Sequence, residues 1–163
     1  MAFAGGVGGV LQSILVVCVG NICRSPLGER LLQEALRDTD MSIASCGIAA
    51  VVGHGADETA AAVARDSGIS LEGHVARQFT PEMGKAHDLI LVMESGHKRE
   101  ITRHAPELSG RIMLFDHWTG ARDIPDPYRK PRAFHDAVHA RLREAASGWA
   151  ARLAPSPGRK VSK

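Results

Sequence analysis

Cys18 and Arg24 are the residues whose types and spacing point most directly to chemistry. Five residues separate them, between an apolar run and the pair Ser25–Pro26. The thiolate of cysteine is a nucleophile, and a planar guanidinium can hold two oxygens of a tetrahedral oxyanion. The two side chains could therefore attack and grip one phosphoryl group. The structural alternative is a small buried cysteine at a strand end and a solvated arginine at a helix start.

The segment between them is expected to wrap an anion with its backbone. A loop that joins a strand to a helix N-terminus directs several N–H groups to one point, where the helix dipole adds positive potential. Gly20 permits backbone conformations that other residues resist. Asn21 tolerates a left-handed conformation. The phosphate-binding residues predicted on this basis are Val19, Gly20, Asn21, Ile22, Cys23 and Arg24.

A strand and a helix are predicted to position this loop. Ile14 to Val17 is an aliphatic run without polar alternation, which is typical of a parallel strand buried on both faces. Ser25 predicts a helix N-cap and Pro26 the first helical residue. Leucines and alanines then recur at helical spacing as far as Leu36. The loop should thus lie between the carboxyl end of a strand and a helix.

The rest of the chain alternates between predicted strands and helices. Further strands are expected over residues 41–46, 88–93 and 111–115. Helices are expected from Asp57 to Arg65 with a stop at Gly68, from a Thr80 cap to about His87, over 94–104 and over 133–153. Residues 69–78 and the proline-rich segment 123–131 predict irregular structure. In the last helix, the apolar positions are Phe134, Ala137, Val138, Leu142, Ala145, Trp149 and Leu153.

This alternation predicts a single three-layer α/β domain. Its centre should be a mostly parallel four-stranded sheet flanked by helices, with the phosphate-binding loop after the first strand. Ligands in such folds bind beyond the carboxyl ends of the strands, where Cys18 is expected. We predict a flexible N-terminal extension over residues 1–12, the folded domain over 13–154 and a disordered tail over 155–163.

Composition narrows the class of protein. The chain has 163 residues, 44% of them hydrophobic, which suits one domain with a substantial core. Its net charge is +2, so no large cationic surface for nucleic acid is expected. Neither a secretory signal nor a long apolar span is evident, which predicts a cytoplasmic protein without membrane insertion. Three cysteines, an odd number, favour reduced thiols over a disulfide framework.

Two motifs together carry a resemblance to a known family. The segment Val17 to Pro26 and the tripeptide Asp126-Pro127-Tyr128 resemble the low-molecular-weight protein tyrosine phosphatases. The likeness covers roughly residues 14–153. Segments 71–78, 113–118 and 124–130 further resemble the bacterial branch that partners tyrosine autokinases in exopolysaccharide production. The resemblance implies a metal-independent phosphotyrosine phosphatase without a cofactor, whose substrate would be a phosphotyrosine protein such as a tyrosine autokinase.

The resemblance also implies roles for individual residues. Cys18 would form a phosphocysteine while Arg24 and the loop amides hold the phosphoryl oxygens. Ser25 would donate a hydrogen bond to the thiolate. Asn21, Ser45 and His74 match positions whose hydrogen bonds brace the loop; a turn residue and an unrelated surface histidine are the structural alternatives for Asn21 and His74.

The leaving group should receive its proton from Asp126. An acid on the phenolic oxygen is worth about 10²–10⁴-fold, and the family match assigns this role to Asp126, which Pro125 and Pro127 hold rigidly. Asp123 is the competitor. Tyr128 would form one wall of the substrate cleft, with Ile48 and its neighbours in the 48–55 loop opposite. Arg129 is assigned to the cleft, and with Lys130 it could attract an acidic substrate tail.

The other cysteines and two histidines have less specific interpretations. In relatives of this family, a cysteine at the position of Cys23 can form a protective, reversible disulfide with the nucleophile; simple packing of the loop is the alternative. Cys46 is expected to pack. His135 and His139 have the spacing of a metal pair, but without a third ligand we expect solvated positions and no metal site. Arg141, Arg143 and Glu144 also predict a solvated face.

Three rival functions are weaker. An arsenate reductase would use the same anion loop but needs resolving cysteines downstream, and none follows Cys46. A redox protein built on Cys18 and Cys23 would lack the close spacing of thioredoxin-like motifs. A non-catalytic phosphotyrosine-binding module would not need both Cys18 and Asp126. Their joint presence favours an enzyme.

Overall fold

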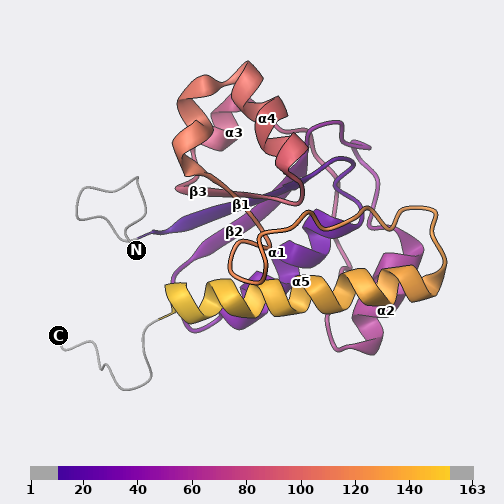
Figure 1. Cartoon of the computed structure of the whole chain (residues 1–163). Helices are drawn as coiled ribbons and strands as arrows, with labels where there is room; N and C mark the ends of the chain where they lie inside the picture. The colour runs from indigo at the N-terminus through magenta and orange to yellow at the C-terminus, as the bar shows by residue number, and fades with distance from the viewer. Residues whose placement is uncertain (1–10, 155–163) are drawn as a thin grey trace.

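The computed structural model describes residues 11–154, with a four-stranded parallel sheet at the centre (Figure 1). The strands are β1 (Ser13–Cys18), β2 (Ser42–Gly47), β3 (Leu89–Val92) and β4 (Ile112–Leu114). Their order is β2-β1-β3-β4, and all three neighbouring pairs are parallel. The predicted fold class is therefore confirmed, with a sheet that is wholly parallel. The predicted N-terminal extension covers residues 1–10, which lie outside the described residues, and Leu11 and Gln12, which the structure describes. The predicted C-terminal tail, residues 155–163, also lies outside the described residues.

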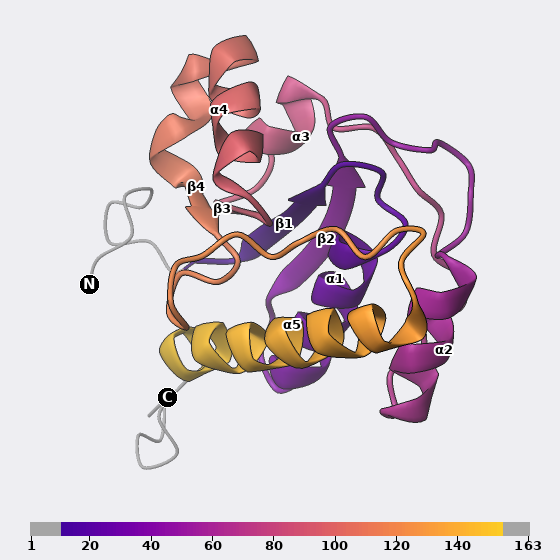
Figure 2. The ribbon, with the colours of Figure 1, turned by 45° about the vertical axis from the view of Figure 1, so that its right-hand side comes forward.

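Helices cover both faces of the sheet. Figure 2 shows α5 (Arg132–Leu153) crossing in front of α1 (Arg24–Ala35) on one side, with α3 (Pro81–Lys85) and α4 (Ser95–His104) on the other. Helix α2 (Glu58–Asp66) lies beside α5. A 3-10 helix over Pro106–Arg111, which the sequence pattern did not predict, leads into β4. None of the helices within residues 11–154 is both long and apolar enough to cross a membrane.

Alternate residues of the central strands build two separate cores. Ile14, Val16 and Leu91 face the side of α1 and α5. Leu15, Val17 and Ile90 face the side of the 3-10 helix. All six are fully buried. This two-sided burial explains why β1 and β3 are apolar without alternation, and it holds the end of β1, at Cys18, rigidly in the middle of the sheet.

The closing helix differs from expectation in which residues it buries. His135 and His139, predicted to be solvated, are only 4% and 6% exposed. Ala137, predicted on the apolar face, is exposed. The buried side of α5 consists of His135, Val138, His139, Leu142, Ala145, Ala146 and Trp149. The two histidines share the helical spacing of that face, so packing against α1 and α2 buries them despite their polarity.

Candidate active site

The phosphate-loop geometry begins with Cys18 at the carboxyl end of β1. Its Sγ lies 2.9 Å from the hydroxyl of Ser25, and the backbone N–H of Ser25 points at the same sulfur at 3.4 Å. The thiol is only 3% exposed. The prediction that Ser25 caps the helix is wrong: α1 begins at Arg24, with Cys23 in the N-cap position. The Ser25 hydroxyl instead serves the sulfur, where it can stabilise a thiolate.

Asn21 braces the loop with its side-chain amide and its backbone carbonyl. Its backbone is left-handed, with φ of 59°. Its Nδ2 donates to Ser25 Oγ at 2.7 Å and to Ser45 Oγ at 3.0 Å. Its Oδ1 accepts the backbone N–H of Arg77 at 3.0 Å, and its carbonyl accepts Nε2–H of His74 at 2.7 Å. Both interpretations of Asn21 thus hold together, and His74 lies against the loop, buried rather than free on the surface.

The Arg24 guanidinium is buried and clamped on one side. Its Nη1 donates to Glu94 Oε2 at 2.5 Å and to the Ile124 carbonyl at 2.7 Å. The side chain is 2% exposed, yet it lines the same cleft as Cys18. A buried guanidinium needs such partners, and this clamp leaves Nη2 and Nε for an anion. Figure 2 shows the segment before α5, in orange, passing close to the loop before α1.

Asp126 reaches the cleft from that segment. Its Oδ2 is 3.8 Å from Arg24 Nη2, and its Oδ1 accepts the backbone N–H of Tyr128 at 3.0 Å. The carboxyl is about half exposed, at 48%, so a substrate can approach it. Asp123 is occupied elsewhere, because its Oδ1 accepts the N–H of Ser95 at the start of α4 at 2.8 Å. Of the two candidates, only Asp126 lines the cleft.

The cleft has a volume of about 190 Å³ and differs from the sequence prediction on one wall. Tyr128 lines it as expected, but Ile48 does not; Ala49 and Val51, its neighbours in the same loop, do. Ile48 is partly buried and packs against the core cluster on the side of the 3-10 helix, which explains its absence from the cleft. Arg129 is also outside the cleft walls. Its exposed guanidinium lies 5.2 Å from the Tyr128 ring centroid, over the ring face.

The remaining cysteines are buried and free, as is Cys18. Burial, followed by the charge of Asp57, raises the pKa of the Cys23 thiol well above its ordinary range. Burial raises the pKa of Cys46 to about 12, and this residue packs in the core as expected. Cys23 lines the cleft together with Cys18. The protective disulfide remains a prediction.

Sequence reasoning missed Glu94 and His97, which support Arg24. Glu94 lies two residues after β3 and caps α4. Its carboxylate accepts the N–H of His97, while Nδ1 of the His97 ring accepts the N–H of Glu94 at 3.2 Å. Burial and the nearby charge of Arg24 lower the pKa of His97, which favours the neutral ring that can accept. The signal was an acid three residues before a histidine at a strand end, a variant of the usual capping box.

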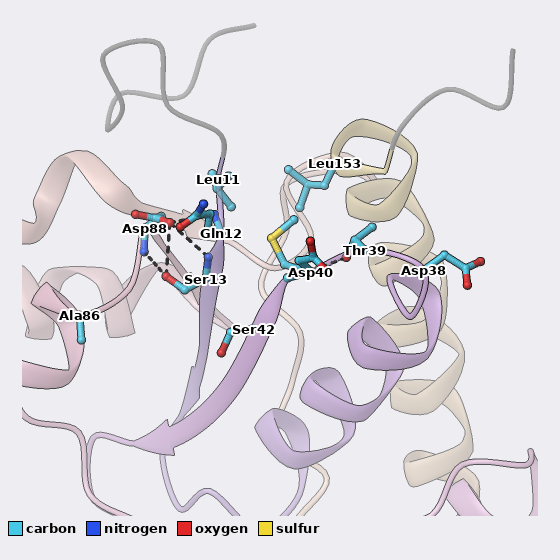
Figure 3. Close-up of a pocket in the computed structure, with 11 residues that line it drawn as sticks. Leu11, Gln12, Ser13, Asp38, Thr39, Asp40, Ser42, Ala86, Asp88 and Leu153 are labelled. Atoms are coloured by element: carbon cyan, nitrogen blue, oxygen red, sulfur yellow. Dashed lines mark hydrogen bonds between the residues drawn. The ribbon is translucent and has the colours of Figure 1, made fainter. Parts of the chain in front are cut away.

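A larger cavity lies at the other end of the sheet and is not this site. It has a volume of about 850 Å³ and opens near the starts of β1 and β2, lined by Ser13, Ser42 and Leu153 among others (Figure 3). Asp88 also lines it, and its Oδ2 already accepts the N–H groups of Gln12 and Ser13. No group of three or more metal-ligating side chains converges anywhere within residues 11–154.

Sequence comparisons point to one family. The family model described as low molecular weight phosphotyrosine protein phosphatase matches residues 13–158. The low-molecular-weight protein-tyrosine-phosphatase Etp of Escherichia coli K12 is 50% identical over 142 residues, which are 87% of this chain and 95% of that protein. Wzb of the same strain is 48% identical over 144 residues, 88% of this chain and 97% of that protein.

Solved structures agree with the sequence comparisons. The Erwinia amylovora tyrosine phosphatase AmsI superposes with a TM-score of 0.87 at 49% identity, over 92% of this chain and 98% of that chain. Vibrio vulnificus Wzb, solved in complex with benzylphosphonate, gives 0.85 at 45% identity, over 88% and 99%. The arginine phosphatase YwlE of Geobacillus stearothermophilus gives 0.81 at 30% identity, over 87% and 92%.

Proposed function

The chain belongs to the low-molecular-weight protein-tyrosine phosphatase family, and from this premise we propose that it hydrolyses phosphotyrosine through a cysteinyl phosphate formed on Cys18. One observation carries the proposal: Cys18 and Arg24, at the two ends of the loop between β1 and α1, line one cleft together with Asp126 from the distant segment before α5. We assign the catalytic unit to residues 13–154. We place it in the cytoplasm, because the three free cysteines suit a reducing compartment.

In the first step, the Cys18 thiolate attacks phosphorus. The S–P bond forms as the P–O bond to tyrosine breaks, and Asp126 delivers its proton to the departing phenolic oxygen. Arg24 and the amides of the loop stabilise the charge on the three equatorial oxygens. The clamp from Glu94 and Ile124 fixes one side of the guanidinium in advance, so little reorganisation is needed in the transition state.

In the second step, water attacks the phosphocysteine. Asp126, now a carboxylate, removes a proton from that water, and the S–P bond breaks to release inorganic phosphate. The hydroxyl and N–H of Ser25 lie at hydrogen-bonding distances from the sulfur. They stabilise the thiolate as it leaves.

The test of this function uses two substrates and one variant. Purified protein should hydrolyse p-nitrophenyl phosphate and a phosphotyrosyl peptide in the presence of EDTA, and Cys18→Ser should be inactive while still binding phosphate. Phosphoarginine is the matched alternative substrate, given the likeness to YwlE. The flat Tyr128 wall favours an aromatic ring, so phosphotyrosine should be preferred. Full activity in Cys18→Ser, or a strict need for a divalent metal, would contradict the mechanism.

The physiological substrate is proposed to be a bacterial tyrosine autokinase of exopolysaccharide production. Support comes from the resemblance of segments 71–78, 113–118 and 124–130 to that branch of the family. The exposed cations Arg129 and Lys130 also follow the cleft wall directly and would attract an acidic tail. Phosphoproteins retained by Cys18→Ser in a lysate should include the kinase. Their absence from the retained set, with other phosphotyrosine proteins present, would argue against this substrate.

A further inference from the structure

A cavity away from the active centre has the features of a ligand site. It lies between α1, the end of α2 and α5, and its volume of about 350 Å³ falls within the range of small-molecule pockets. Leu31, Ile69 and Ala146 give it an apolar wall. Charged side chains stand at its mouth. These walls suit a small molecule that is partly apolar and partly ionic.

His139 is the buried polar group of this cavity. Only 6% of His139 is exposed. Neither of its ring nitrogens has a hydrogen-bond partner among the described residues. Native proteins retain few buried polar groups without partners, because each loses its hydration without compensation. A histidine of this kind in a cavity wall therefore points to a partner that enters from outside.

The charge at the mouth favours an anion. Arg143 lies one helical turn after His139, is exposed, and forms no ion pair with any residue of the described chain. Glu34 and Arg37 face the same cavity from α1 but neutralise each other at 2.7 Å. The net free charge is thus the one on Arg143. Burial and this charge lower the pKa of His139, with Asp136 on α5 acting weakly in the opposite sense.

We propose that this cavity binds a small organic anion. Its anionic group lies between Arg143 and the His139 ring, and its apolar part rests against Ile69 and Ala146. The anion compensates Arg143 and gives the orphan imidazole a partner. Binding favours the protonated ring, so it is coupled to proton uptake and strengthens as the pH falls.

The same histidine connects this cavity to the active centre. It also lines a small void of about 10 Å³ together with Cys23 and Pro127. Cys23 belongs to the phosphate loop, and Pro127 directly follows Asp126. His139 therefore forms a wall shared between the anion cavity and a void that adjoins both catalytic segments. Binding of an anion that fixes the His139 ring is therefore expected to change the environment of Cys23.

Benzoate is a suitable probe, with uncharged benzamide as the control for charge. In NMR titrations, saturating benzoate should raise the pKa of His139 by roughly one unit, as an opposite charge nearby does, and should shift the Cys23 amide signal. Arg143→Gln should lose both effects. Arg65→Gln, at an exposed arginine on α2, should keep them. Because the catalytic residues are intact in Arg143→Gln, benzoate bound in the active centre alone would still shift Cys23 there.

A second variant makes the test independent of Arg143. His139→Leu removes a buried polar group without partners, so it should fold at least as stably as the parent chain and should bind benzoate at least tenfold more weakly in calorimetry. Equal affinity in His139→Leu, equal effects of benzamide, or shifts unchanged in Arg143→Gln would overturn the site. A His139 response without any Cys23 response would overturn the connection to the active centre.

Discussion

At the scale of single residues, the proposed active centre depends on side chains that each have two structural roles. Asn21 holds a left-handed backbone and four hydrogen bonds. Ser25 accepts from Asn21 and faces the Cys18 sulfur. Glu94 caps a helix and clamps Arg24. Because each of these groups is fixed by more than one partner, the proposed phosphate loop is held in one arrangement by the protein's own contacts, which is what electrostatic catalysis requires.

Substitution of each of the two aspartates before α5 should have clearly different effects on kcat. Asp126→Asn removes the only acid of the pair that lines the cleft. We expect kcat to fall by about 10²–10⁴-fold with substrates that have poor leaving groups, and by less with p-nitrophenyl phosphate. Steady-state kinetics with a series of aryl phosphates would measure this dependence. Asp123→Asn is the matched control and should keep most activity. The reverse order of effects would assign the acid to Asp123.

His97 should act through Glu94 and not by contact with substrate. In His97→Ala, the Glu94 N–H loses its acceptor and the carboxylate that holds Arg24 becomes less constrained. One hydrogen bond is worth about 1 kcal/mol net, so inhibition by inorganic phosphate should weaken about fivefold. His104→Ala, at an exposed histidine of the same helix, serves as the control. A lower thermal stability with unchanged phosphate inhibition would show a purely structural role.

At the scale of elements, the carboxyl ends of the parallel strands bring the residues of the site together. β1 ends with Cys18, the turn between β3 and α4 contains Glu94, and the loop before α5 contains Asp126. β2 contributes by close approach: a Cβ atom on Gly47 would lie 2.3 Å from the carbonyl oxygen of Val19 and 3.0 Å from the nitrogen of Asn21. The end of β2 is thus packed against the backbone of the phosphate loop.

Gly47→Ala should therefore displace the backbone of the phosphate loop, although Gly47 is not part of that loop. The added methyl group meets backbone atoms, which cannot rotate away, so the loop must move. We expect kcat/KM to fall at least about tenfold, with a loss of stability of about 1–3 kcal/mol as in other overpacked sites. Enzyme assays and urea denaturation would give the two numbers. Gly110→Ala, where a Cβ meets nothing within 4 Å, is the control. Full activity in Gly47→Ala would mean that the loop tolerates displacement.

At the scale of the whole molecule, the sequence predicted periodic features well and specific contacts poorly. The strands, the main helices and the loop after β1 follow from apolar runs, capping residues and prolines, which are local signals. The burial of His135 and His139 and the inward turn of Ile48 depend on what packs against them, and local patterns do not contain that information. The clamp of Glu94 on Arg24 joins residues 70 positions apart, a contact that a single sequence cannot reveal.

Two buried histidines make the stability of the whole fold sensitive to acid. Burial lowers the pKa of both His97 and His139 below the usual value near 6.5. Between the lowered pKa and about 6.5 the unfolded chain binds more protons than the folded one, so the free energy of unfolding falls as the pH drops through that window. Urea midpoints should decrease from pH 7 to pH 5. The decrease should be smaller in His139→Leu, and identical slopes for both proteins would contradict this origin.

Covalent capture of the phosphoryl group on Cys18 tests the central claim most directly. The enzyme is mixed with a large excess of p-nitrophenyl phosphate, quenched in acid within milliseconds, digested, and examined by mass spectrometry under conditions that preserve thiophosphate esters. We predict one added phosphoryl group on the peptide that contains Cys18, and a larger labelled fraction in Asp126→Asn, because that variant lacks the base that activates water in the second step. A phosphoryl group on another side chain, or turnover without any labelled peptide, would contradict the mechanism.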